Sequence, residues 1–232
     1  MNPELQFVLL PGLHGSDEMW QPFLDAAPDG CTLLPVSYPS EPPSGYSSLE
    51  VFVRSILPTD SPFVLVAESF SGPIAIRIAA APPNNLSALV LCNSFAASPA
   101  WSVWTWFPWK TLFRIPGPSL IIRRYFVGAS ASAPQVQQVR DLVLRSDPAV
   151  LAARVRLVLS TDVRERLSKI RLPVLCVRGT EDRLVPSHAL QTIRDLLPSV
   201  AVSFVPAPHF TLQTAPSETW QAIRRFSRQL TA

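Results

Sequence analysis

The segment Phe63–Pro73, with the sequence FVLVAESFSGP, decides the fold of this chain. Its opening FVLV run is typical of a buried strand, and the Gly-Pro pair that closes it is typical of the start of a helix. Ala67 and Ser71 stand two residues before and two after Ser69, so a sharp strand-to-helix turn fits without collision. We expect a strained backbone at Ser69 and a hydroxyl raised above the sheet edge. Ser71 is the competing serine, but Pro73 would crowd the turn there, which favours helix capping for Ser71.

Short apolar runs alternate with amphipathic stretches on both sides of this segment. The runs predict buried strands over 6–10, 32–36, 63–66, 88–91, 174–177 and 201–205. The stretches between them predict helices over 18–26, 49–57, 71–81, 188–196 and 218–230. Strands that alternate with helices indicate an α/β fold, with a mostly parallel sheet covered by helices on both faces.

Residues 96–169 break this alternation. They contain no convincing strand, and helices are predicted over 134–145 and 148–161. The block holds 11 Lys and Arg against 4 Asp and Glu, a charge of +7, which leaves 9 − 13 = −4 for the rest of the chain. We predict a core of residues 1–95 and 170–232, and a helical cap inserted between two strands over 96–169.

Composition excludes several classes of protein. Of the 232 residues, 47% are apolar and 16% are charged, which is unlike a disordered chain. The pI of about 9.0 does not indicate nucleic-acid binding, because no basic run and no nucleic-acid-binding motif is present. Cys31, Cys92 and Cys176 are far apart, which favours buried thiols over a metal site and suits a reducing compartment. With no signal peptide and no membrane-spanning stretch in the sequence, we expect a cytoplasmic protein; the sequence does not indicate its oligomeric state.

A nucleophilic serine needs a base, and the base needs an acid that orients it. His209 follows the last predicted strand and precedes the last helix, so it should reach the carboxyl edge of the sheet. His188 is expected near the start of a helix, whereas His14, in the loop after the first strand, is the rival base. Asp182 follows another buried strand and is the acid candidate, with Glu181 as the adjacent alternative. Helix capping or a pair with Arg183 are the other interpretations of Asp182.

Four segments in this order resemble motifs of the α/β-hydrolase fold family. LLPGLHGSDEMW resembles its oxyanion loop, AESFSGP its nucleophile elbow, GTEDRLVP its acid loop and PAPHF its histidine loop. The resemblance covers nearly the whole chain and matches the family's order of Ser69, Asp182 and His209. Two features differ. Pro11-Gly12 replaces the usual His-Gly pair, and the N-terminus is shortened, so that the family's first two strands are missing or very short.

The resemblance implies a serine hydrolase that uses no cofactor and no metal. It implies that Ser69 is the nucleophile, His209 the base and Asp182 the acid, and that the backbone N–H groups of Leu13 and Phe70 form the oxyanion hole. The expected activity is that of a carboxylesterase acting on a small apolar ester. Thioesterase, lipase-like, carbon–carbon hydrolase and acyltransferase activities share this triad, and a non-catalytic ligand-binding module is the alternative outside enzymes.

Aromatic residues crowd the start of the predicted cap. Trp101, Trp104, Trp106 and Trp109 are four of the 6 tryptophans, and Phe107 and Phe113 accompany them. Rings this dense predict that several face the cleft or solvent and that the substrate carries an apolar acyl or aryl group. We predict a pocket lined by His14, Trp101, Trp104 and Trp106. Alternatively, basic residues such as Arg114, Arg123 and Arg124 hold the cap against an anionic lipid surface.

Overall fold

A computed structural model describes residues 6–100 and 102–228, and within these ranges six strands form one sheet. The order is β2-β1-β3-β4-β5-β6, and every pairing is parallel. The strands are β1 (Gln6–Leu10), β2 (Thr32–Pro35), β3 (Phe63–Glu68), β4 (Leu86–Cys92), β5 (Val174–Gly179) and β6 (Ala201–Val205). All six predicted strands are present, because strands buried on both faces appear in the sequence as continuous apolar runs.

Helices connect the strands as crossovers. Those of the core are α1 (Gln21–Asp25), α2 (Tyr46–Ile56), α3 (Gly72–Ala80), α8 (Arg164–Leu167), α9 (Ser187–Leu196), α10 (Thr211–Thr214) and α11 (Pro216–Arg228). Two starts differ from the prediction by three residues. α1 begins three residues later than expected, with Pro22 in its first turn. α2 begins three residues earlier, because the Tyr46 ring is buried against Phe70, a tertiary contact that local sequence does not reveal.

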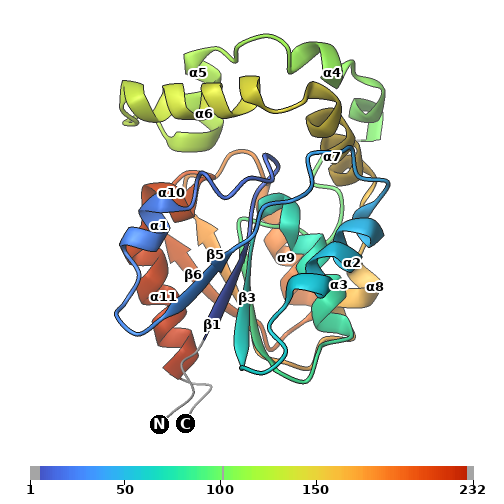
Figure 1. Cartoon of the computed structure of the whole chain (residues 1–232), viewed down its shortest axis with the longest axis vertical. Coiled ribbons are helices and arrows are strands. Elements are labelled where there is room, and N and C mark those ends of the chain that lie inside the picture. The colour runs from blue at the N-terminus through green and yellow to red at the C-terminus, as the bar shows by residue number, and fades with distance from the viewer. Residues whose placement is uncertain (1–5, 101, 229–232) are drawn as a thin grey trace.

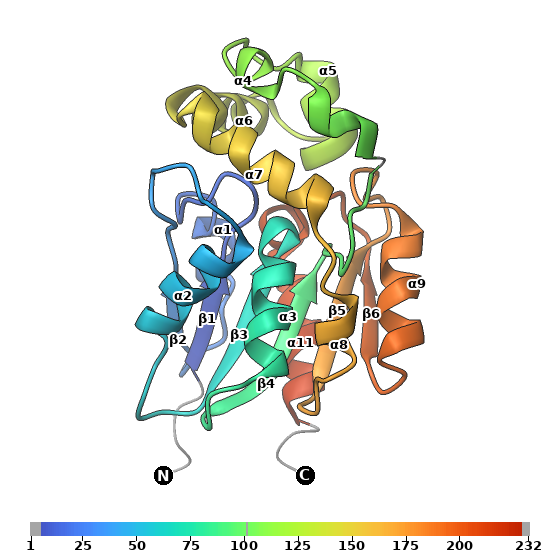
Figure 2. The same ribbon diagram turned by 90° about the vertical axis from the view of Figure 1, so that its right-hand side faces the viewer.

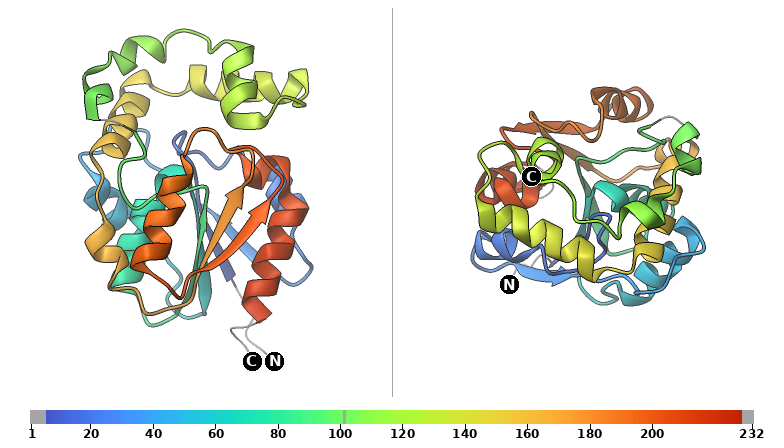
Figure 3. Two further views of the ribbon diagram at one scale, coloured as in Figure 1. Left: turned by 180° about the vertical axis from the view of Figure 1, so that it is seen from behind. Right: turned by 90° about the horizontal axis from the view of Figure 1, so that it is seen from above.

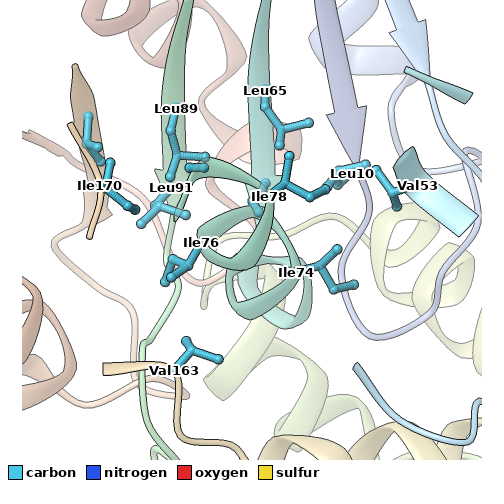
Figure 4. Close-up of a cluster of buried hydrophobic side chains, with 14 of the residues drawn as sticks. Leu10, Val53, Leu65, Ile74, Ile76, Ile78, Leu89, Leu91, Val163 and Ile170 are labelled. Atoms are coloured by element: carbon cyan, nitrogen blue, oxygen red, sulfur yellow. The ribbon is translucent and has the colours of Figure 1, made fainter. Parts of the chain in front are cut away.

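The helices form a layer on each face of the sheet. α1 and α11 cover one face, and α2, α3, α8 and α9 cover the other (Figures 1 and 2). Alternate strand residues serve the two layers: Phe7 and Leu9 pack toward Trp220, while Val8 and Leu10 pack toward α2 and α3. Figure 4 shows part of the second layer, with Leu65 and Leu89 of the sheet facing Ile74 and Ile78 of α3.

Helices between β4 and β5 lie across the carboxyl edge of the sheet (Figures 1 and 3). They are α4 (Trp109–Leu112), α5 (Ser119–Ile122), α6 (Ala133–Arg145) and α7 (Pro148–Ser160), with a π-helical turn over Arg123–Val127. An antiparallel bridge between Ala97 and Asp162 joins the two ends of this segment. Val163 and Leu167 already belong to the core cluster, so the core packing resumes a few residues before 170. The division into core and cap domain stays a prediction.

Among the helices of residues 6–100 and 102–228, none combines the length and the apolar character that crossing a membrane requires.

Candidate active site

Ser69 occupies the turn between β3 and α3. Its φ of 47° places a residue other than glycine in the left-handed region, where the backbone is strained. The Ser94 hydroxyl donates to the Ser69 carbonyl at 2.7 Å and helps to hold this conformation. A Cβ atom on Gly72 would collide with the Ser94 hydroxyl, so the turn needs its glycine three residues after the serine. The strained turn at Ser69 therefore has the expected form.

Ser71 does not cap α3, which corrects the expectation from the sequence. No side chain caps this helix, and the buried Ser71 hydroxyl instead donates to the Pro11 carbonyl. The Ser71 and Tyr38 hydroxyl oxygens lie 2.5 Å apart. Ser71 therefore links the elbow to the loop after β1, a contact across 60 residues that local pattern does not reveal.

His209 is the histidine that the structure brings to Ser69. Its Nε2 lies 2.9 Å from the Ser69 hydroxyl oxygen, and its Nδ1 lies 3.1 Å from Oδ1 of Asp182. His14 is turned elsewhere: its Nδ1 accepts the Ser16 backbone N–H, and its Nε2 lies 4.0 Å from Glu68. The exposed His188 lies at the start of α9. Neither rival is placed to serve Ser69 as a base.

Asp182 is buried and held from several sides. Its Oδ1 accepts the Leu184 and Val185 backbone N–H groups at 2.9 and 3.1 Å, and Nη1 of Arg178 donates to its Oδ2 at 2.8 Å. Burial alone would raise the pKa of Asp182, but the hydrogen bond and charge of His209 and the charge of Arg178 together lower it. The carboxylate is thus ionised at neutral pH and can stabilise a positive imidazole ring.

Arg178 is the ion partner of Asp182, instead of the Arg183 considered from the sequence. It stands four residues before Asp182 and is buried beside it at the end of β5. The i, i+4 spacing of Arg178 and Asp182 in RGTED was the one sequence signal for this ion pair. Glu181, the alternative acid, is exposed.

Asn93 positions the histidine loop, and sequence reasoning missed it. The residue is buried at the end of β4 with a φ of 45°. Its side-chain amide donates to the His209 carbonyl at 2.7 Å, and its side-chain oxygen accepts the Gly179 N–H at 2.8 Å. A polar residue directly after a buried strand was the one available signal. Asn93 joins the loops that carry Asp182 and His209.

The loop after β1 carries the predicted oxyanion donor Leu13. The Gly12 carbonyl accepts the Gly15 N–H at 3.0 Å, which orients the Gly12–Leu13 peptide. Arg154 of α7, a buried residue, donates to the Leu13 and His14 carbonyls at 3.1 and 2.6 Å. Gly15 has a φ of 72°, and a Cβ atom there would collide with the Arg154 guanidinium. Sequence analysis did not single out Arg154, which ties the segment above the sheet edge to this loop.

Three of the residues predicted to line a pocket, His14, Trp104 and Trp106, lie within the described part of the chain. His14 is buried beside Glu68, the Trp104 ring packs with Phe107 and Trp109, and Trp106 is 89% exposed to solvent. Trp101 lies outside the described residues. The rings of Phe210 and Phe126 lie beside His209, with centroids 6.0 and 6.4 Å from that of the histidine. The role of His14 and the tryptophans in a pocket stays a prediction.

Comparisons with known proteins identify the family of the chain and several relatives. The family model described as "Alpha/beta hydrolase family" matches residues 7–222. A Variovorax paradoxus protein assigned as the carbamate hydrolase RutD is 26% identical over 219 residues, which cover 86% of this chain and 82% of that protein. The pimeloyl-acyl-carrier-protein methyl ester esterase of Vibrio campbellii is 26% identical over 211 residues, covering 83% of this chain and 82% of that enzyme.

Solved structures share the fold. An esterase from Thermogutta terrifontis superimposes with a TM-score of 0.80 at 21% identity, covering 98% of this chain and 91% of that structure. Because its family model spans most of its length, the chain belongs to the alpha/beta hydrolase family.

Proposed function

We propose that this protein is a serine hydrolase that cleaves carboxylic esters of apolar acyl or aryl groups through an acyl-enzyme. The observation that carries the proposal is the continuous contact from Ser69 through His209 to Asp182, at 2.9 and 3.1 Å. The order serine, acid, histidine along the chain is that of α/β-hydrolases. The Vibrio campbellii relative is named as a methyl ester esterase, which also supports an ester substrate.

The proposed reaction has two halves. Nε2 of His209 takes the Ser69 proton while the serine oxygen bonds to the ester carbonyl carbon, and Asp182 stabilises the resulting imidazolium. His209 then gives the proton to the leaving alkoxide oxygen as the carbon–oxygen bond breaks. In the second half, His209 takes a proton from water, the hydroxide attacks the acyl-enzyme, and the carboxylic acid leaves as the proton returns to Ser69.

The negative charge that develops on the carbonyl oxygen needs donors. We propose the backbone N–H groups of Leu13 and Phe70, which lie on the loop after β1 and directly after Ser69. Within the described part of the chain, no backbone carbonyl accepts the Leu13 N–H, which is compatible with this role. Loss of one such donor typically lowers the rate by about 10²–10³.

The segment over residues 96–169 is proposed as the cap that shapes the acyl site. The turn over Arg123–Val127 lies against the histidine loop, since the Phe210 N–H donates to the Phe126 carbonyl at 2.9 Å. The Phe126 and Phe210 rings are 5.4 Å apart. Aromatic walls of this kind suit an apolar acyl or aryl group better than a sugar or a charged substrate.

A substrate panel tests the proposal. Esters and matching thioesters of short, medium and long acyl chains should be compared for kcat/KM, with Ser69→Ala as the control. We expect apolar esters to be hydrolysed and kcat to fall by about 10⁶ in the Ser69→Ala variant. Residual activity within about tenfold of wild type would refute Ser69 as the nucleophile. Faster cleavage of every thioester than of its matching ester would instead assign a thioesterase.

A further inference from the structure

The outer part of the cap is unusually apolar for a solvent-facing surface. We define the cap tip as residues 104–125, which include α4 and α5. Large exposed apolar side chains concentrate there: of the fourteen in the described residues, seven belong to the cap tip. The most exposed of these seven are Trp106, Leu120 and Ile115, at 89, 77 and 59%. Grouped exposed apolar residues mark an interaction surface, whereas scattered ones need no explanation.

The charge of the cap tip has a single sign. Lys110, Arg114, Arg123 and Arg124 lie within it, and no Asp or Glu occurs anywhere between Glu68 and Asp141. In the described part of the chain, Lys110, Arg114 and Arg124 have no carboxylate within ion-pair distance. The surface therefore offers cations that are not neutralised within the molecule.

The location of the cap tip leaves it accessible. α4 and α5 lie at the end of the molecule beyond the carboxyl edge of the sheet (Figures 1 and 2). Both helices have only four residues, and Pro108, Pro116 and Pro118 interrupt the segment. The surface is thus made of short pieces instead of one long face that would pair with a partner helix.

We propose that the cap tip binds the surface of an anionic lipid bilayer. Tryptophan and tyrosine rings prefer the membrane–water interface, apolar side chains enter the acyl boundary, and cations are attracted to anionic headgroups. The cap tip supplies all three in Trp106 and Tyr125, Leu120 and Ile115, and Arg114 and Arg124. This binding does not depend on the proposed function.

The segment that carries the cap tip also continues to His209. Tyr125 and Phe126 are consecutive residues of one π-helical turn, and Phe126 packs beside His209. We infer that an apolar ester held in the bilayer reaches Ser69 from this side, an inference that rests on the proposed function.

Vesicle sedimentation tests the binding with the Ser69→Ala chain, so that turnover cannot alter the lipid. The probes are vesicles of phosphatidylcholine alone and of phosphatidylcholine mixed with phosphatidylglycerol. We expect binding to the anionic vesicles to be at least about tenfold tighter and to weaken at high salt. A Lys110→Glu/Arg114→Glu/Arg124→Glu variant should lose the preference for anionic vesicles, and a Trp106→Ala/Leu120→Ala variant should lose binding to both.

Val51→Ala/Phe204→Ala is the matched control, because these side chains are 69 and 62% exposed on the core. It should bind as the parent chain does. Tryptophan fluorescence gives a second readout that needs no cap variant. Anionic vesicles that carry a quenching lipid should quench the emission. Because Trp20 and Trp220 are buried, this quenching reports on the tryptophans of residues 96–169.

Three results would overturn the proposal. The first is no sedimentation with anionic vesicles, and the second is equal binding to neutral vesicles. The third is a dimer in light scattering that Trp106→Ala/Leu120→Ala dissociates, which would assign the cap tip to a second copy of the chain.

Discussion

Two residues at the carboxyl ends of neighbouring strands adopt left-handed backbone conformations. Ser69 follows β3 with a φ of 47°, and Asn93 follows β4 with a φ of 45°. Each such residue costs on the order of 1–3 kcal/mol, and it persists only where its surroundings hold it. The Ser94 hydroxyl holds Ser69, while the hydrogen bonds of its own side-chain amide hold Asn93. Within residues 6–100 and 102–228, the strained residues other than glycine are thus these two, Ser69 and Asn93.

The sequence predicted one of these residues and not the other. Ser69 could be found because its small neighbours and its position between a strand and a helix are local features. Asn93 could not be found in this way. It acts through contacts with Gly179 and His209, which lie 86 and 116 positions further along the chain. Arg154 was missed for the same reason, since its partners Leu13 and His14 lie 141 and 140 positions away. Arg178 is only four residues from Asp182, but its burial beside that carboxylate depends on the fold.

Asp182→Asn tests the acid at the residue scale. An amide at this position favours the wrong tautomer of His209, so kcat should fall by about 10⁴ while the fold is retained. Steady-state kinetics and circular dichroism check both points. Glu181→Gln is the matched control, because Glu181 is exposed, and its kcat should be unchanged. Equal losses in the two variants would contradict the role of Asp182.

At the scale of elements, a buried side chain of α7 binds two loops at the carboxyl edge of the sheet. Arg154 donates to carbonyls of the loops after β1 and β2, including Pro39 at 3.2 Å, and its guanidinium lies over the Tyr38 ring. Burial lowers the pKa of Arg154 to about 10, so the side chain remains charged at neutral pH. The backbone of the predicted oxyanion loop is therefore held by a side chain of α7.

Arg154→Met should impair transition-state stabilisation more than substrate binding. With the Leu13 and His14 carbonyls released, the loop loses its orientation, and kcat should fall by up to about 10²–10³ with a smaller change in KM. Arg154→Lys should recover little, because one ammonium cannot replace the planar fork. Arg156→Met on the exposed side of α7 is the control. A folded Arg154→Met variant with wild-type kcat would show that the contact is only structural.

Elements were predictable where burial alone decides them. The six strands and the long helices α6 and α7 follow from apolar patterns and from the capping residues Ser132 and Asp147. The four-residue helices α4 and α5 were not predictable, because prolines interrupt their sequence and leave too few residues for a periodic pattern.

For the whole molecule, a buried histidine links stability to pH. Burial first, and then the charge of Arg154, lower the pKa of His14 to about 4. The unfolded chain takes up this proton near pH 6.5, whereas the folded chain resists it. Stability from His14 is therefore complete above pH 6.5 and is lost as the pH falls toward 4, by roughly 3 kcal/mol in total.

His14→Asn isolates this contribution, since asparagine can still accept the Ser16 N–H. Burial raises the pKa of Glu68, whose titration acts in the opposite direction, but Glu68 is present in both chains. Urea unfolding between pH 7 and pH 4 should show a smaller loss of stability in the variant than in wild type. His188→Gln, at an exposed position, should behave as wild type. Parallel curves for wild type and His14→Asn would contradict the assignment.

Covalent labelling tests the central claim, that Ser69 is an activated nucleophile, most directly. A fluorophosphonate should add one adduct per chain by intact-mass spectrometry, peptide mapping should locate it on Ser69, and Ser69→Ala should remain unmodified. An adduct at another serine, or a wild-type chain that stays unmodified while folded, would contradict the account.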